Sequence, residues 1–372
     1  MFLQKLRLYN FKNHQEVTLN FEDKINCFLG KNGIGKTNLL DAIYYLSFTK
    51  SAINPYDLQN IHHGQSGFLI KGTFAIDNKQ KEVMCSFQQG EKKIVREDEQ
   101  EPVKFSEHVG KYPVVLIAPQ DIELIWDGSE LRRRFFDSLI SQLDRHYLDY
   151  LIVYNHQLKQ RNSLLRSFSE SGKVDADLLD SYDLKLVESG TYLHKIRKGF
   201  LMEFIPKFKQ HYDFLVQESE EKANIQYRSD LEETSFSALL KKNLQRDLIL
   251  QRTTTGIHRD DFLFVLNEQE LKRAGSQGQQ KSFLIGLKLT EFQILAEQKQ
   301  VKPILLLDDI FDKLDDLRIQ QLMKLVSQGT FGQLFITDAR QGRSKQILSE
   351  ARIGAHLFVL ENSTFNQEWL KI

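Results

Sequence analysis

The sequence lacks the marks of secreted and membrane-spanning proteins. Only two cysteines, Cys27 and Cys85, occur among 372 residues, and their wide separation indicates neither a disulfide framework nor a zinc site. The N-terminus, MFLQKLRLYNFKNH, has no continuous apolar region, and no stretch approaches the roughly 18 apolar residues of a membrane helix. We therefore expect no export, no membrane span and a cytoplasmic protein.

An excess of charge of one sign is also missing. Lys and Arg number 50, Asp and Glu number 50, and the formal net charge is zero, so the charge balance favours neither an acidic nor a basic partner. Any surface for nucleic acid must therefore be a local patch. With 41% hydrophobic residues, a chain of this length can bury a large core in one big domain or two unequal lobes.

Apolar periodicity in the first third of the chain is typical of a mixed α/β fold. Alternating apolar residues up to Phe21 predict a β-hairpin. Residues 25–29 form an apolar run that predicts a strand, and a glycine-containing loop and a helical pattern follow it. Further strands are expected within residues 66–96 and at 113–118.

The middle of the chain has a different pattern. Between Ser129 and Thr255 the only proline is Pro206, glycines are few, and apolar residues recur at helical spacing. The α/β pattern returns after Gly256, with strands expected at 262–266, 304–307 and 334–337 and a helix after Ser276. We predict a discontinuous α/β domain, residues 1–128 and 256–372, with a mostly helical second lobe, residues 129–255, and no long coiled coil.

Residues 30–37, GKNGIGKT, match the phosphate-binding P-loop pattern between a strand and a helix. Glycines let backbone N–H groups converge on phosphate oxygens, and the following helix contributes its positive end. Lys36 adds a point charge, and the Thr37 hydroxyl can ligate Mg²⁺ that bridges the terminal phosphates. The candidate ATP-binding residues are Gly30, Lys31, Asn32, Gly33, Ile34, Gly35, Lys36 and Thr37.

A second motif narrows the class of P-loop protein. The apolar strand at residues 304–307 ends in Asp308 and Asp309, which is the Walker B arrangement. In that arrangement Asp308 would hold Mg²⁺ through water, and Asp309 could orient or activate the attacking water. Asp309 and Lys36 are therefore the candidate catalytic residues, and Thr37 and Asp308 the candidate Mg²⁺ site.

A third motif, SQGQQK at residues 276–281, opens a helical run shortly before the Walker B strand and looks like an ABC signature motif. A Ser hydroxyl and a glycine amide at a helix N-terminus make an anion site. Because the P-loop already accounts for one nucleotide, we expect this site to bind the ATP of a second copy, so that ATP joins two copies head to tail. A plain helix N-cap is the alternative interpretation. The candidate signature residues are Ser276, Gln277, Gly278, Gln279 and Gln280.

With these motifs in hand, the chain resembles the RecF family almost from end to end. The segments that carry the resemblance are LRLYNFKNH, PQDIELI, RRRFFD, TGIHRDD, GSQGQQKS and LLLDDIFDKLD. The resemblance implies an ABC-type ATPase head, with a mixed sheet and flanking helices, joined to the helical lobe. It also implies that Gln120 occupies a Q-loop and that Asp312 and Asp315 fall in a D-loop beside Walker B.

The same resemblance implies a function in DNA replication, DNA repair and the SOS response. The family dimerises on ATP, binds DNA near single-strand gaps and helps to load RecA together with RecO and RecR. Two departures from the wider ABC pattern favour slow hydrolysis: Asp309 stands where transporters usually carry Glu, and no His follows residues 334–337. We expect a timing switch that turns over more slowly than the enzyme median of about 10 per second.

Basic clusters are candidate DNA contacts, because Lys and Arg neutralise phosphates. In a neutral chain such clusters are more often solvated helix faces or internal ion pairs. The clusters are Arg132, Arg133 and Arg134; Lys159, Arg161 and Arg166; and Lys195, Arg197 and Lys198. The first of them can alternatively brace the interface between the lobes.

Other features leave alternatives open. His62 and His63 lack companions at metal-ligand spacing, so we expect no metal there. A P-loop kinase of a small acceptor is the rival function, but such a kinase would not need the signature motif. Another SMC-like or OLD-like DNA ATPase would share the same head.

Overall fold

The computed structural model describes residues 1–77, 79–98, 100, 104–217, 220–361 and 364–371, without the side chains of residues 312 and 313. Contacts between residues divide the chain into two compact units. The first, here called the sheet unit, comprises Met1–Asp121, His211–Gln217 and Lys281–Ile372, and the second, the helical unit, comprises Ile122–Gln210 and Glu218–Gln280.

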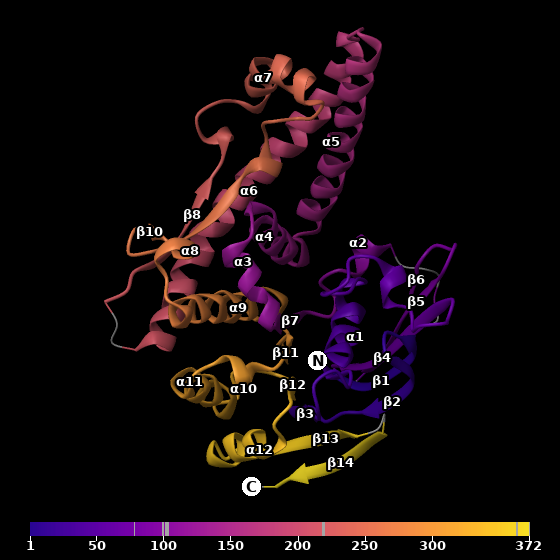
Figure 1. The fold of residues 1–372 in the computed structure, drawn as a ribbon, viewed down its shortest axis with the longest axis vertical. Helices are drawn as coiled ribbons and strands as arrows, with labels where there is room; N and C mark the ends of the chain where they lie inside the picture. Colours follow the sequence, from indigo (N-terminus) through magenta and orange to yellow (C-terminus); the bar gives the residue numbers. More distant parts are fainter. Residues whose placement is uncertain (78, 99, 101–103, 218–219, 362–363, 372) are drawn as a thin grey trace. The chain divides into compact units, whose positions relative to one another are not determined.

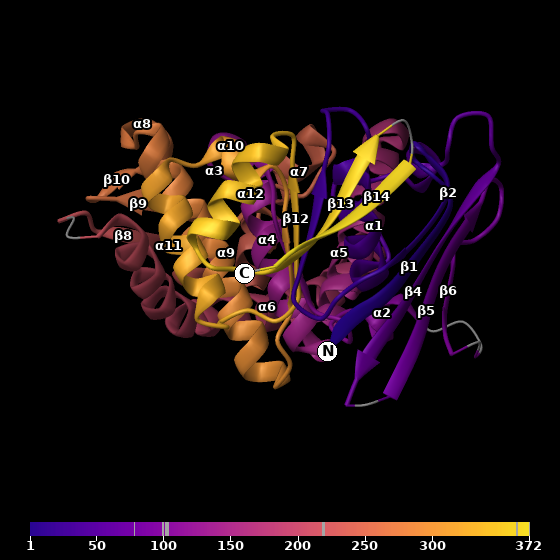
Figure 2. The same ribbon diagram turned by 90° about the horizontal axis from the view of Figure 1, so that it is seen from below.

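The sheet unit contains two β-sheets (Figure 2). An antiparallel sheet has the order β2-β1-β4-β5-β6, with β1 (Phe2–Phe11), β2 (His14–Asn20), β4 (Gly67–Ile76), β5 (Lys79–Gln88) and β6 (Ile94–Glu97). A mixed sheet has the order β14-β13-β3-β12-β11-β7, with β3 (Ile25–Leu29), β7 (Val114–Ile117), β11 (Ile304–Leu307), β12 (Leu334–Asp338), β13 (Ala355–Glu361) and β14 (Thr364–Leu370). Neighbours from β13 to β7 run parallel, and β14 alone pairs antiparallel.

Helix α1 (Lys36–Phe48) joins the two sheets into one core. It contacts β1, β4 and β5 of the antiparallel sheet as well as β7 and β12 of the mixed sheet. Ten of its 13 residues are buried, as expected for a helix that is covered on more than one side. The other helical segments of this unit are η1 (Asp57–Asn60), α2 (Phe105–His108), η2 (Pro119–Ile122), α9 (Gln277–Lys299), α10 (Ile310–Lys313), α11 (Asp316–Ser327) and α12 (Gln341–Glu350).

The helical unit is built around three long helices, α5 (Arg145–Ser171), α6 (Ala176–Val216) and α7 (Phe236–Leu250) (Figure 1). Asp144 caps α5 by accepting a hydrogen bond from the backbone N–H of Tyr147. Its other elements are α3 (Glu123–Trp126), α4 (Ser129–Leu143), β8 (Ala223–Arg228), η3 (Asp230–Glu232), η4 (Ile257–Arg259), β9 (Asp261–Leu266), β10 (Gln269–Glu270) and α8 (Leu271–Ala274). The three strands form an antiparallel sheet in the order β10-β9-β8.

Most of the predicted elements are confirmed, including the N-terminal hairpin and the strand at residues 304–307. Strands β13 and β14 were not predicted. The compact units and the predicted lobes have different bounds: residues 122–128 and 256–280 group with the helical unit, and residues 211–217 group with the sheet unit. Strand β9, expected to belong to the α/β domain, pairs with β8 and β10 and with neither large sheet.

No helix among the described residues combines the length and the apolar character that a membrane crossing requires.

Candidate nucleotide-binding site

The candidate site forms where three parallel strands end. Strand β12 pairs with β3 on one side and with β11 on the other. The carboxyl ends of parallel neighbours meet at one edge of a sheet, where α/β proteins bind ligands. This edge carries the start of the P-loop at Gly30, the acids Asp308 and Asp309, and Thr337.

Lys36 lies at the start of α1 with its ammonium group turned into the P-loop. Its Nζ donates hydrogen bonds to the carbonyl oxygens of Gly30, at 2.7 Å, and Lys31, at 3.0 Å. The residue is 6% exposed. Burial lowers the pKa of Lys36, and the nearby carboxylates of Asp309 and Asp308 oppose that shift. The loop therefore surrounds a cation that two carboxylates attract.

Thr37 and Asp308 meet although 271 positions separate them in the sequence. The Thr37 hydroxyl lies 2.9 and 3.1 Å from the two carboxylate oxygens of Asp308. The hydroxyl of Thr337 donates to the same carboxylate at 2.6 Å and accepts from the backbone N–H of Asp309 at 2.9 Å. Thr337 thus links both Walker B acids. No sequence motif identifies Thr337, and its place at the end of a predicted strand is the one feature of the sequence that points to it.

These groups surround a cavity of about 260 Å³. It is lined by Asn32, Gly33, Gly35, Lys36, Thr37, Asn38, Pro119, Asp308, Asp309 and Thr337. Most of the predicted ATP and Mg²⁺ residues therefore share one cavity. Gln120, the predicted Q-loop residue, is half-buried and directly follows Pro119 in η2.

The residues present fit a magnesium ion. A Thr hydroxyl and a carboxylate supply the hard oxygen ligands that Mg²⁺ prefers, and this ion takes few protein ligands when phosphates and waters complete its shell. Within the described residues no cluster of three or more His, Cys, Asp or Glu side chains could hold a metal by itself. Thr37 and Asp308 are therefore suited to a metal that arrives with a phosphate ligand.

Asp121, in the stretch after β7, belongs to a largely buried charge pair that no sequence motif indicates. Lys288 Nζ of α9 lies 3.5 Å from Asp121, and the same ammonium lies 3.5 Å from Glu291. Burial lowers the pKa of Lys288, but Asp121 and Glu291 outweigh it and leave the pKa raised. The second carboxylate oxygen of Asp121 accepts from the N–H of Ala118 at 2.8 Å. This pair fixes the end of the loop that contains Gln120.

The signature residues begin α9, and Ser276–Gln280 fall in the helical unit. Ser276 N–H donates to Gln279 Oε1 at 2.7 Å, and the Ser276 hydroxyl accepts from Gln279 N–H at 3.3 Å. This reciprocal pair is a capping box. Ser276 and Gln277 are exposed, Gly278 is half-buried, and Gln280 is buried with its amide on the carbonyl of Gly275.

Of the two predicted D-loop residues, the Asp312 side chain lies outside the described part of the structure. Asp315 caps α11 by accepting from the backbone N–H of Arg318 at 3.0 Å, and it also forms an ion pair with the Arg318 guanidinium. Arg318 Nε donates to the hydroxyl of Ser282 in α9 at 2.6 Å. Asp315 is therefore connected to the helix that starts at the signature motif.

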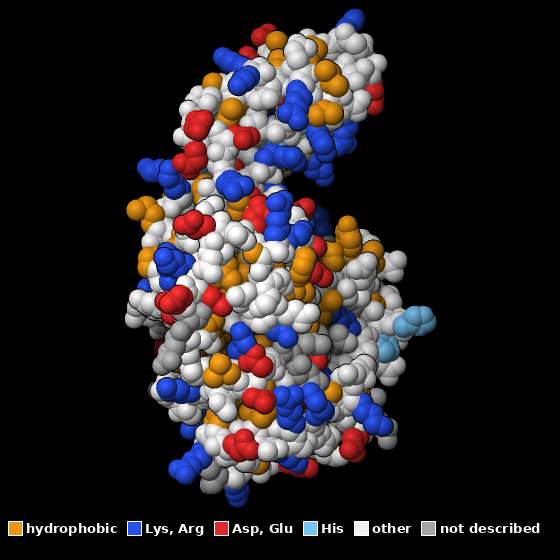
Figure 3. Space-filling model, turned by 60° about the vertical axis from the view of Figure 1, so that its left-hand side comes forward, with side chains coloured by type: hydrophobic (Ala, Val, Ile, Leu, Met, Phe, Trp, Pro, Cys, Tyr) orange, Lys and Arg blue, Asp and Glu red, His pale blue; other side chains and the backbone are white. Residues whose placement is uncertain are grey.

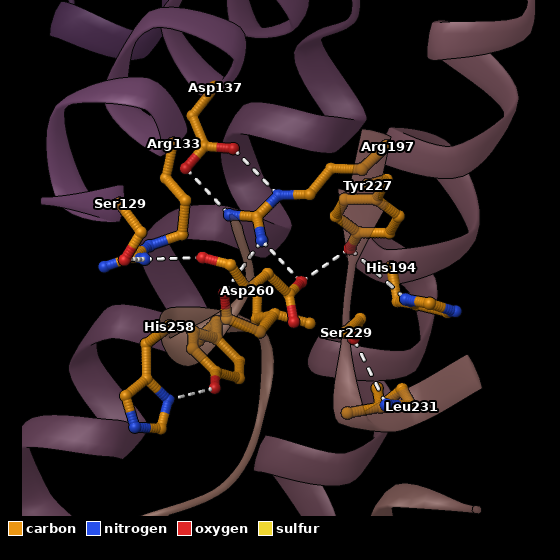
Figure 4. A network of polar contacts seen from close by, with 12 residues as sticks. Ser129, Arg133, Asp137, His194, Arg197, Tyr227, Ser229, Leu231, His258 and Asp260 are labelled. Atoms are coloured by element: carbon orange, nitrogen blue, oxygen red, sulfur yellow. Dashed lines mark hydrogen bonds and ion pairs between the residues drawn. The ribbon is translucent and has the colours of Figure 1, made fainter. Parts of the chain in front are cut away.

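Several predicted DNA-contact residues are engaged inside the helical unit. Arg132 is 8% exposed and pairs with Asp261 at 2.8 Å. Arg133 donates to the Asp260 carbonyl oxygen and to the Ser129 hydroxyl, both at 2.6 Å (Figure 4). Arg134 alone of the three is exposed, with an ion pair to Glu130 within α4.

Two further basic residues from the predicted clusters are buried. Arg161 pairs with Asp183 at 2.6 Å and with Asp247 at 2.7 Å, and its side chain is fully buried. Arg197 lies between the carboxylates of Asp137 and Asp260, at 2.9 and 3.0 Å (Figure 4). Charges this deeply buried are retained only when they are paired. Arg161 and Arg197 are therefore internal ion-pair partners, which excludes them from a DNA surface.

Comparisons with known proteins agree with the resemblance seen in the sequence. Residues 2–357 match the family described as RecF/RecN/SMC N terminal domain. The DNA replication and repair protein RecF of Flavobacterium johnsoniae is 46% identical over 360 residues, which cover 97% of this chain and 100% of that protein. Its counterpart from Cytophaga hutchinsonii is 43% identical over 367 residues, which cover 99% of this chain and 97% of that protein.

Solved structures give the same result. A structure of the recombination mediator protein RecF with ATP, in the RecFOR pathway, superposes with a TM-score of 0.89 at 30% identity and covers 99% of this chain and 97% of that one. An Smc head bound to the C-winged helix domain of ScpA superposes with a TM-score of 0.56 at 12% identity, covers 100% of this chain and 98% of that one, and shares the fold alone. The predicted ATPase-head fold is thus confirmed. Because relatives more than 40% identical match almost their whole length, the chain belongs to the RecF family of DNA replication and repair proteins.

Proposed function

We propose that this protein is an ATP-switched DNA-binding factor of recombination repair. It binds gapped DNA at junctions of single and double strands and helps to load RecA together with RecO and RecR, in the cytoplasm and in support of replication and the SOS response. Support comes from the names of its relatives and from the RecFOR pathway of its structural neighbours. The observation that carries the proposal is the joining of Thr37 to Asp308 in the cavity of the P-loop.

The proposed ATP site has residues 30–37 around the phosphates, with Lys36 as the cation of the loop. Thr37 and Asp308 would hold Mg²⁺, which neutralises phosphate charge when it is bound. Gln120 would couple the site to the rest of the chain. Asp309 lines the same cavity and would orient the attacking water. Hydrolysis at this site is proposed to be slow, as a timer for the bound state.

The second half of each site would come from another copy of the chain. Ser276 and Gln277 are exposed at the N-terminus of a 23-residue helix, which offers a positive end to an anion. The P-loop of the same chain already accounts for the phosphates of one nucleotide, so the ligand of Ser276 and Gln277 is best sought on a second copy. ATP would then hold two copies together, with Asp312 and Asp315 beside the shared surface.

The proposed DNA surface is a local patch on the helical unit. Figure 3 has several Lys and Arg side chains on the upper, helical part of the face it draws. Arg134, Lys159, Arg166 and Lys195 are exposed, so phosphates can reach them in a way that they cannot reach the buried arginines. Their contribution would appear as salt-dependent affinity.

Sedimentation velocity tests the composite site. Ser276→Arg should bind ATP with normal affinity but remain a monomer, because the added side chain blocks the anion site without touching the P-loop. Lys36→Met is the matched variant and should lose tight ATP binding and dimerisation together. If Ser276→Arg dimerised with ATP as well as the unchanged protein does, the shared-site proposal would be abandoned.

A DNA titration tests the choice of substrate. Gapped duplex and intact duplex of equal length are compared, with and without ATP and at two salt concentrations. Tighter binding to the gapped form with ATP, weakened by salt, is expected. Equal affinity for both forms in all conditions would contradict the proposed preference for gaps.

A further inference from the structure

The turn between β1 and β2 lies directly against the P-loop. Asn13 Nδ2 donates to the carbonyl oxygen of Ile34 at 3.0 Å, and its Oδ1 accepts from Asn38 Nδ2 at 2.7 Å. His14 Nε2 lies 3.1 Å from the carbonyl oxygen of Gly35, and His14 is 7% exposed. Because a carbonyl oxygen only accepts, Nε2 carries the ring proton. Three contacts therefore tie this turn to the C-terminal half of the loop and to the first turn of α1.

Gly35 leaves no space between the turn and the loop. Its φ is 110°, a conformation that side chains rarely adopt, and a Cβ at this position would lie 2.3 Å from Asn13 Nδ2. The amide of Asn13 thus packs on bare backbone. That backbone is the part of the P-loop that leads into α1, where N–H groups must converge on phosphate.

The turn is anchored from behind. Lys12 pairs with Asp41 of α1 at 2.6 Å, and their side chains are 7% and 1% exposed. His62 donates from Nδ1 to the Lys12 carbonyl oxygen at 2.7 Å and from its backbone N–H to the Asn10 carbonyl oxygen at 2.8 Å. Asn10 and Lys12 have φ values of 52° and 53°, which are uncommon without glycine. A buried ion pair and a second loop therefore hold the turn in an otherwise unfavourable shape.

We propose that the turn Lys12–His14 is a positioning element of the nucleotide site, with Asn13 as the residue that sets the backbone of the P-loop for phosphate. Asn13 acts through the loop and does not touch the base or the ribose. His62 would support this turn through its two hydrogen bonds to the backbone. It rests on the proposed binding of ATP phosphates by residues 30–37.

Isothermal titration calorimetry with Mg-ATP and with Mg-tripolyphosphate tests this role. Asn13→Ala removes two hydrogen bonds of ordinary strength, so both ligands should bind about five- to tenfold more weakly and by the same factor. Asn20→Ala is the matched control, because Asn20 is an exposed asparagine at the far end of the same hairpin. The melting temperatures of both variants should stay close to that of the unchanged protein.

The two ligands separate the outcomes. If Asn13→Ala weakened ATP but not tripolyphosphate, Asn13 would contact the nucleoside and the inference would be overturned, as it would be if neither affinity changed. Asn13→Ser retains a hydroxyl that can make one of the bonds and should lose less; it decides the matter if the alanine variant does not fold. If the unchanged protein bound neither ligand, the proposed function itself would fail.

Discussion

Replacing Arg197 with methionine tests the energetic importance of the buried polar network in the helical unit. The guanidinium donates to Asp137, to Asp260 and to the carbonyl oxygen of Ile257, at distances from 2.9 to 3.0 Å. Asp260 is 1% exposed and also accepts from the Tyr227 hydroxyl at 2.5 Å. Arg197→Met has a similar volume, so it removes charge and hydrogen bonds with little change in packing.

The expected loss follows from what remains. Removing one partner of a buried ion pair leaves an uncompensated charge, which costs about 3–5 kcal/mol of unfolding free energy. For a unit of this size that loss corresponds to a drop of about 6–20 °C in melting temperature. Burial raises the pKa of Asp260, while Arg197 lowers it. Without Arg197 this pKa rises further, so the deficit should be largest at neutral pH and should shrink as acid protonates Asp260.

Thermal unfolding followed by circular dichroism at the helix band measures the loss, at pH 7.5 and at pH 5. Arg134→Met is the control, because Arg134 is 68% exposed at its side chain and surface changes of this kind stay within about 0.5 kcal/mol. Adding Asp260→Asn to Arg197→Met should restore part of the stability, since a neutral amide needs no cation. A melting temperature for Arg197→Met within about 2 °C of the control would refute the reasoning.

Two further changes have directions fixed by the structure. Asp309→Asn should slow phosphate release by about 10²-fold or more while ATP still joins two copies, because Asp309 lines the cavity but is not one of the P-loop donors; a phosphate-release assay beside sedimentation checks both. Burial lowers the pKa of His258 to about 4, whereas an unfolded histidine titrates near 6.5, so stability should fall as pH drops from about 6.5 to 4. His258→Gln should make the melting temperature depend less on pH over this range. An unchanged pH dependence would argue against a role of His258.

Local patterns were sufficient to predict which residues gather around the candidate nucleotide site. The P-loop needs a strand, a glycine-containing loop and a helix in direct succession, and Asp308 and Asp309 follow an apolar run that could only be a buried strand. The motifs assign Thr37 and Asp308 to one Mg²⁺ site, and these two side chains meet although 271 positions separate them. Such sites can be recognised in a sequence because phosphate binding by the backbone requires particular residue types at particular positions.

Pairings without a motif could not be predicted. Arg161 and Arg197 lie on helices in clusters of basic residues, for which the sequence leaves DNA contacts, solvated faces and internal ion pairs open, and each is buried against acids from other segments. The position of β9 depends in the same way on its partner strand β8. Strand β8 begins at Ala223, 38 residues before β9 begins at Asp261. These arrangements follow from tertiary packing, which periodicity within one segment does not contain.

The capping box at the start of α9 does not use the hydroxyl proton of Ser276. A hydroxyl has two lone pairs and a single proton, and Ser276 uses only a lone pair when it receives the N–H of Gln279. The hydroxyl proton can turn toward a further acceptor while the hydrogen bond that caps the helix is kept. The Ser276 hydroxyl can therefore cap the helix and donate its proton to an oxyanion at the same time, without loss of the capping hydrogen bond.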